Sequence, residues 1–148
     1  MDELRIRAAG TEDVGALANL MTELGYPSSV AEMRRRFESI SADLSYETFV
    51  AEGGKEVVGM IGIRLERTYE ADGNCARVMA PVVFSEHRGR GAGRALICAA
   101  EEWARRRGAE TVVLTTHKRR AEAHRFYRNM GYEAAGYRFY KSLANANC

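Results

Sequence analysis

The hydrophobic positions change their spacing along the chain, and each change predicts a new element. Leu4–Ala8 alternates apolar and polar residues, which is typical of a strand with one buried face. Apolar residues then recur at helical spacing in two stretches, so we expect two helices to follow this strand. Thr11 should cap the first helix, and Ser28 or Ser29 should cap the second.

The middle of the chain has the period of β-strands. Tyr46–Glu52 and Glu56–Glu66 lie on either side of Gly53-Gly54, a pattern that predicts a tight hairpin. A further strand over residues 75–84 would complete an antiparallel meander. Pro81 cannot donate a hydrogen bond to a neighbouring strand, so we expect a bulge or an unpaired position there, and the hydrogen-bond register is defined only to within one residue.

The second half of the chain alternates helices and short strands. The continuous apolar run Val112–Leu114 suits a strand that is buried on both faces. The resulting order, β-α-α-β-β-β-α-β-α-β, predicts an α/β protein with a mixed sheet, helices on its faces and one domain spanning residues 1–148. The expected elements are a helix over 91–107, a strand over 111–116, a helix over 120–130, and strand-like segments over 132–135 and 137–143.

Composition narrows the possible partners. The net charge of +2 over 148 residues is small and the basic triplets form no continuous stripe, so we expect no nucleic-acid partner. The three cysteines lack the paired spacing of a disulfide framework or a zinc site, so we expect no metal. No apolar run could span a bilayer and the N-terminus lacks a signal segment, which predicts a cytoplasmic protein without a membrane partner.

Residues 88–94 combine glycines and arginines directly before an expected helix. Glycines let backbone N–H groups approach a ligand, the helix directs its positive end to the same place, and the arginines add charge. The pattern therefore favours an anion site, such as one for a pyrophosphate, over a turn that merely links strand to helix. The candidate binding residues are Arg88, Gly89, Arg90, Gly91, Ala92, Gly93 and Arg94.

Two common nucleotide-binding motifs fit this loop poorly. A Walker loop ends in Gly-Lys-Ser/Thr, whereas Gly93-Arg94-Ala95 provides no hydroxyl group for magnesium. A Rossmann motif needs Gly-x-Gly-x-x-Gly after the first strand of a βαβ unit, whereas this loop follows an antiparallel meander. A nucleotide-binding oxidoreductase is kept as one alternative.

Two segments resemble one family. Arg88-Gly89-Arg90-Gly91-Ala92-Gly93 is similar to the Arg/Gln-x-x-Gly-x-Gly/Ala signature of the GCN5-related N-acetyltransferases (GNAT). Ala123–Tyr127, followed by Met130-Gly131-Tyr132, looks like the later tyrosine helix of that family. Within the family, Val57–Gly62 and Ala123–Tyr127 look most like the aminoalkylphosphonate N-acetyltransferases. The resemblance implies a GNAT-like acyl-CoA N-acyltransferase fold.

The resemblance also implies a mechanism. Acetyl-CoA would be the co-substrate, with its pyrophosphate on the glycine loop and its pantetheine chain between strands 75–84 and 111–116, which would splay apart. Val82 and Val83 would offer backbone hydrogen bonds, and the N–H of Val82 could polarise the thioester carbonyl. Tyr127 would be the general acid for the departing thiolate, although its spacing also suits a core aromatic residue. The acetyl group would pass directly to a small primary amine, such as an aminoalkylphosphonate.

The general base and the acceptor site are less defined. Ala80 occupies the position where some relatives have a glutamate, which leaves His117, Glu66 or Glu70 as candidates for a base. Arg120 replaces the asparagine of many relatives, and this favours a phosphate or phosphonate contact as much as a solvated helix face.

Three arginines near the expected hairpin end offer a further acceptor contact. Arg64, Arg67 and Arg77 could hold a phosphonate or a carboxylate, whereas acidic residues in the loops could attract an amine. Without a clear base, a non-catalytic acyl-CoA sensor module stays an alternative to an enzyme. The terminal strands could also pair in a homodimer.

Overall fold

The computed structural model describes residues 3–116 and 121–145, which divide after Leu114 into two compact units. His117 and Arg120, expected near the site, lie outside the described residues. None of the helices in the described part of the chain is long and apolar enough to cross a membrane.

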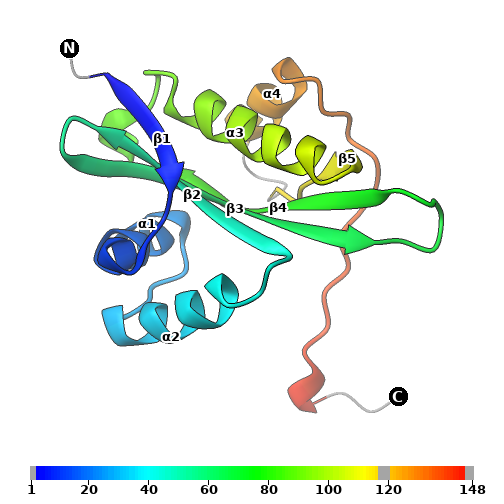
Figure 1. Cartoon of the computed structure of the whole chain (residues 1–148), viewed down its shortest axis with the longest axis horizontal. Helices are drawn as coiled ribbons and strands as arrows, with labels where there is room; N and C mark the ends of the chain where they lie inside the picture. Colours follow the sequence, from blue (N-terminus) through cyan, green and yellow to red (C-terminus); the bar gives the residue numbers. More distant parts are fainter. Residues whose placement is uncertain (1–2, 117–120, 146–148) are drawn as a thin grey trace. The chain divides into compact units, whose positions relative to one another are not determined.

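The first unit is a five-stranded mixed sheet with helices on both faces (Figure 1). Its first four strands are antiparallel in chain order and the fifth runs parallel to the fourth, which confirms the predicted α/β class. The strands are β1 (Leu4–Ala8), β2 (Tyr46–Gly53), β3 (Glu56–Arg67), β4 (Asn74–Val83) and β5 (Ala109–Val113). Helices α1 (Val14–Leu24) and α2 (Val30–Ser41) cover one face, and α3 (Ala92–Arg106) covers the other.

Two apolar layers hold these helices to the sheet. On the α1/α2 face, Leu17, Leu20 and Phe37 pack with Met60 and Val82 in one buried cluster. Burying each large apolar side chain contributes about 1.5–3 kcal/mol, so these layers fix the helices firmly. The α3 side chains that are almost fully buried are Ala92, Leu96, Ile97, Ala100 and Ala104.

Gly59 on β3 sets how closely α3 approaches the sheet. A Cβ atom at this position would lie 3.1 Å from Leu96 Cδ1 and 3.0 Å from the carbonyl oxygen of Val82. Both contacts are tighter than ordinary van der Waals packing, so the helix can lie this close only because residue 59 has no side chain.

The helix caps confirm one prediction and correct another. Ser29 caps α2, since its hydroxyl accepts a hydrogen bond from the Glu32 N–H at 3.1 Å and Glu32 Oε1 accepts from the Ser29 N–H at 2.9 Å. Thr11 is not the cap of the first helix. It lies inside a 3-10 turn, Thr11–Asp13, and the Asp13 carboxylate accepts the Gly10 N–H at 2.8 Å instead.

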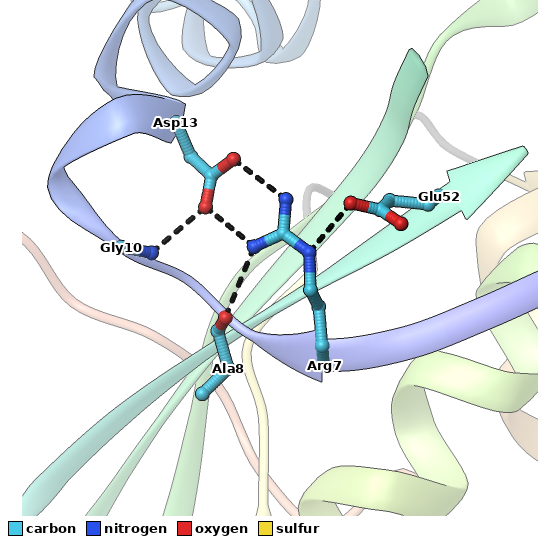
Figure 2. Close-up of polar contacts among 5 residues, drawn as sticks. All are labelled: Arg7, Ala8, Gly10, Asp13 and Glu52. Carbon is cyan, nitrogen blue, oxygen red and sulfur yellow. Dashed lines mark hydrogen bonds and ion pairs between the residues drawn. The ribbon is translucent and has the colours of Figure 1, made fainter. Parts of the chain in front are cut away.

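The same carboxylate belongs to a charged network that joins β1, β2 and the start of α1 (Figure 2). Arg7 donates two hydrogen bonds to Asp13, at 2.7 and 2.8 Å, and one from Nε to Glu52 Oε1 at 2.6 Å. Asp13 is only 4% exposed. The Arg7 guanidinium lowers the pKa of Asp13, and the two carboxylates raise the pKa of Arg7.

Two predictions about the last strands are wrong. β5 ends at Val113, whose side chain is 37% exposed, so β5 is not buried on both faces. In the sheet of the described residues β5 is an edge strand with β4 as its neighbour, and edge strands are only partly covered.

The second unit contains α4 (Ala121–Asn129) but neither of the strands expected over 132–135 and 137–143. Tyr137 and Phe139, which lie in the second of these expected strands, are 81% and 93% exposed. Alternating side chains do not make a strand unless a neighbouring strand accepts and donates the backbone hydrogen bonds.

Replacing Asp13 by Asn should lower the free energy of unfolding by about 1.5–3 kcal/mol at neutral pH, because charge-assisted hydrogen bonds to Arg7 are lost. The folded-state pKa of Asp13 is lowered, so the carboxylate stabilises the fold above the unfolded-state pKa of about 3.9. This contribution disappears as the pH falls through the lower folded-state pKa. Urea unfolding of both proteins from neutral to acid pH should therefore show a smaller difference at the acid end.

Glu102→Gln is the matched control, because Glu102 pairs with Arg105 and Arg106 on an exposed helix surface. Exposed pairs contribute little to stability, so this variant should unfold like the parent protein. Equal losses in both variants would contradict a special role for Asp13.

Candidate active site

β4 carries the expected bulge, and it lies at Ala80 and Pro81. Met60 on β3 pairs with Val82 and Gly62 pairs with Met79, so two residues of β4 oppose one residue of β3. Ala80 has a positive φ of 49°, which is unusual for a residue with a side chain. The prediction from Pro81 is confirmed.

β4 and β5 separate just before this bulge. Their parallel pairing runs from Asn74 with Ala109 to Arg77 with Val113, while β4 continues to Val83. Among the described residues, no strand pairs with this second half of β4 on the β5 side. The pairing thus ends where β5 itself ends, at Val113, and the splaying of the two strands stays a prediction.

The hydrogen bonds of β4 decide which backbone amides face this opening. The N–H of Phe84 donates to the carbonyl oxygen of Val58 on β3 at 2.9 Å. Backbone groups of successive strand residues point to alternate sides, so the N–H of Val82 is also directed toward β3. The N–H and carbonyl of Val83 point to the opposite side, which β5 has left.

The glycine loop follows directly after β4. Arg88 ties it to the strand, because its Nε donates to the carbonyl oxygen of Val83 at 3.2 Å. Glu23 at the end of α1 also holds the loop, since its Oε1 accepts the N–H of Ser85 at 2.9 Å. No motif in the sequence predicts this contact of Glu23, because the two residues are 62 positions apart.

The loop ends at an N-terminus of α3 that no side chain caps among the described residues. Gly91 is the cap residue with φ 89°, and its carbonyl accepts the N–H of Ala95 at 3.0 Å. The N–H groups of Ala92, Gly93 and Arg94 precede this bond and so have no partner within the helix. An anion can accept them, and the helix dipole favours it there.

The space around this helix end fits such a ligand. Apart from each glycine and its two chain neighbours, no atom of the described residues lies within 4 Å of the position where a Cβ atom of Gly89 or Gly91 would be. Arg90 and Arg94 are exposed beside it. Val83 and the loop from Arg88 to Arg94 therefore follow one another from the open side of β4 to the start of α3, whereas the Val82 side chain lies in the buried cluster of the α1/α2 face. That these residues bind the cofactor stays a prediction.

Tyr127 lies in the second unit, on α4. Its ring is edge-on to the rings of Phe126 and Tyr132, with centroids 5.2 and 6.0 Å apart. Its carbonyl oxygen accepts the N–H groups of Met130 and Tyr132, which close the end of the helix. This packing fixes the ring within its own unit.

The described residues contain no group of three His, Cys, Asp or Glu side chains that could hold a metal ion.

Comparison with known proteins extends these observations. The model of the "Acetyltransferase (GNAT) family" matches residues 15–132. The chain is 33% identical over 144 residues to the aminoalkylphosphonate N-acetyltransferase of Salmonella typhimurium, covering 97% of this chain and 94% of that protein.

Solved structures agree with this match. The crystal structure of a transcriptional regulator from Bacillus halodurans is 31% identical and has a TM-score of 0.85, covering 95% of this chain and all of that one. The aminoglycoside N-acetyltransferase AAC(6′)-Iy, in complex with CoA, has a TM-score of 0.85 and covers 97% of each chain. Its 16% identity shows a shared fold alone.

The mixed five-stranded sheet with helices on both faces is the fold of the acyl-CoA N-acyltransferases, as the match to the acetyltransferase structures shows. The chain belongs to the GNAT family and is an N-acetyltransferase. The family uses acetyl-CoA and acetylates small amines.

Replacing Gly91 by Ala should weaken acetyl-CoA binding about tenfold, the equivalent of one charge-assisted hydrogen bond. Beyond the neighbouring backbone, the added Cβ would contact no atom of the described residues, so a ligand on the loop is the other group that it can clash with. Alanine at this positive φ should also cost about 1 kcal/mol of stability. Calorimetric titration and urea unfolding measure the two effects.

Gly108→Ala provides the control at the other end of α3, with φ 82° and the same open surroundings. It should lose similar stability and bind acetyl-CoA like the parent protein. Equal weakening by both variants would mean that backbone strain, and not the loop, is responsible.

Proposed function

We propose that this chain transfers the acetyl group of acetyl-CoA directly to the primary amine of an aminoalkylphosphonate or a similar small molecule. The observation that carries this proposal is the second half of β4, which pairs with no strand of the described residues on the β5 side and leads through the glycine loop to the uncapped start of α3. The 33% identity to an aminoalkylphosphonate N-acetyltransferase supports the choice of acceptor.

The loop from Arg88 to Arg94 would hold the pyrophosphate of acetyl-CoA. The N–H groups at the start of α3 donate to it, and Arg90 and Arg94 contribute charge. Arg88 has a structural role instead, because its hydrogen bond to the carbonyl oxygen of Val83 holds the loop against β4.

Acetyl-CoA, when bound, supplies an acetyl group activated as a thioester. The open edge of β4 can hydrogen-bond the pantetheine chain or stabilise the oxyanion with a preorganised N–H. The alternation of β4 favours Val83 for this donor. Val82 contributes its buried side chain to the α1/α2 face instead.

The acceptor must reach the site as a neutral amine. An alkylammonium group has a pKa of about 10.4, so roughly one molecule in 10³ is neutral at pH 7. Glu66 and Glu70 stay predictions for the base, and the Glu66 carboxylate already accepts two hydrogen bonds from Arg77, at 3.0 and 3.4 Å. Ala80 has no carboxylate that could take the proton of the amine directly. Removal of this proton through a water molecule fits such a site, and His117 stays a prediction for the base.

Tyr127 is our candidate for the general acid that protonates the departing thiolate. The motif around it supports this role, and its ring packing leaves few rotamers for the side chain. Arg120, which precedes the same helix, stays a prediction for a contact with a phosphate or phosphonate.

Release of the CoA thiol in the presence of acetyl-CoA and 2-aminoethylphosphonate tests the function directly. Turnover should require both substrates, and mass spectrometry should find the N-acetyl product. Binding of acetyl-CoA without turnover of any amine in a broad panel would contradict the proposal and favour a sensor.

Tyr127→Phe should lower kcat by about 100-fold or more with acetyl-CoA affinity unchanged, because general acids contribute about 10²–10⁴ in rate. Steady-state kinetics and calorimetric titration separate these two effects. Tyr132→Phe removes the hydroxyl from the neighbouring ring and should keep kcat within about twofold. A Tyr127→Phe enzyme with full kcat would exclude Tyr127 from proton transfer.

A further inference from the structure

The α1/α2 face of the sheet continues beyond its buried cluster into a row of charged residues. Met60, Gly62, Arg64 and Glu66 alternate along β3 and therefore share this face. On β4 the bulge keeps Met79 and Arg77 on the same face as Val82. Arg67 alternates to the opposite face, where Asn74, its partner in the register, bonds the end of α3.

Arg64 and Arg77 lie directly opposite each other in the register. Directly opposite side chains have Cβ atoms about 4.5–5.5 Å apart, and like charges at such a position destabilise a sheet. Glu66, paired with Arg77, and Asp43, near Arg64, offset part of this repulsion. An anion between or above the two guanidinium groups would offset more of it, because arginines bind phosphonate-like oxygens with paired hydrogen bonds.

Each arginine is held from its outer side. Glu66 accepts from Nε and Nη2 of Arg77, at 3.0 and 3.4 Å, so Nη1 remains for another acceptor. Tyr46 supports Arg64, whose Cζ atom lies 5.3 Å from the centre of the ring. These contacts reduce the entropy cost of ordering two long side chains around a ligand.

This patch is open and lies next to the bulge. Met79, between Arg77 and Ala80, is 36% exposed, and Arg64 is exposed as well. Gly62 pairs with Met79 and adds no side chain to fill the space between them. Arg77 precedes Ala80 by three residues, about 10 Å along the strand, which an arginine side chain and a short aminoalkyl chain can span together.

We propose that Arg64 and Arg77 bind the anionic group of the acceptor and so determine its specificity, with Glu66 and Tyr46 as positioning residues. The phosphonate would lie over the arginine pair while its amine points along β4 toward the bulge. This inference rests on the proposed function, since it names the part of the same site that selects the acceptor.

The test compares Arg64→Gln, Arg77→Gln and Arg67→Gln with the parent enzyme on 2-aminoethylphosphonate and on uncharged 2-aminoethanol. The first two variants should lose about 10- to 100-fold in kcat/KM for the phosphonate, mainly through KM, as expected for lost charge-assisted hydrogen bonds. Their activity on 2-aminoethanol and their affinity for acetyl-CoA should change less than about twofold. Arg77→Lys keeps the charge without the paired donors and should recover only part of the loss.

Arg67→Gln is the matched control, because it removes the same charge from the same strand on the opposite face. Equal loss in all three variants would show a long-range effect of net charge, and equal loss on both acceptors would show a structural role. Either result overturns the inference, as does full activity of Arg64→Gln and Arg77→Gln. A parent enzyme that acetylates other amines but never the phosphonate would instead overturn the proposed acceptor.

Discussion

Pro81 has no backbone N–H, so β4 can hold it only where no neighbouring strand accepts a hydrogen bond from that position. Here it lies beside one extra residue of β4, with Ala80 in the left-handed region at a cost of about 1–2 kcal/mol. Regular pairing resumes at Val82 because that side chain completes a buried cluster with Met60. Without the extra residue, Val82 would point to the other face of the sheet, and the cluster beneath α1 would lose a member.

Pro81 and its neighbours show which features of the strand can be predicted from the sequence and which cannot. Periodicity finds the strands and α-helices of the first unit but not its two 3-10 turns, and Pro81 correctly predicts the bulge. Which amide then faces the opening depends on the register, and the bond between Phe84 and Val58 favours Val83 for a donor that the motif placed at Val82. A one-residue difference of this kind is invisible in a hydrophobic pattern, because both residues are apolar.

Other features depend on contacts between distant residues. Nothing near Glu23 marks it as a support of the glycine loop, and nothing near Glu52 marks it as a partner of Arg7, 45 positions away. For residues 132–143 the sequence predicts more than the structure contains. Their alternation resembles a strand, but their large side chains are exposed. Local pattern describes what a segment is able to form, whereas a partner elsewhere in the chain decides whether it does.

Gly59 is buried, yet it affects the position of the N-terminus of α3, which it does not contact. Leu96, the side chain it accommodates, lies about one turn from the uncapped start of α3. Any larger residue at position 59 would push Leu96 away from the sheet. This displacement of α3 would move its N-terminal amides away from the end of β4. Substitutions at residue 59 would then weaken cofactor binding as if the residue contacted the cofactor, although their effect would come from the tilt of α3.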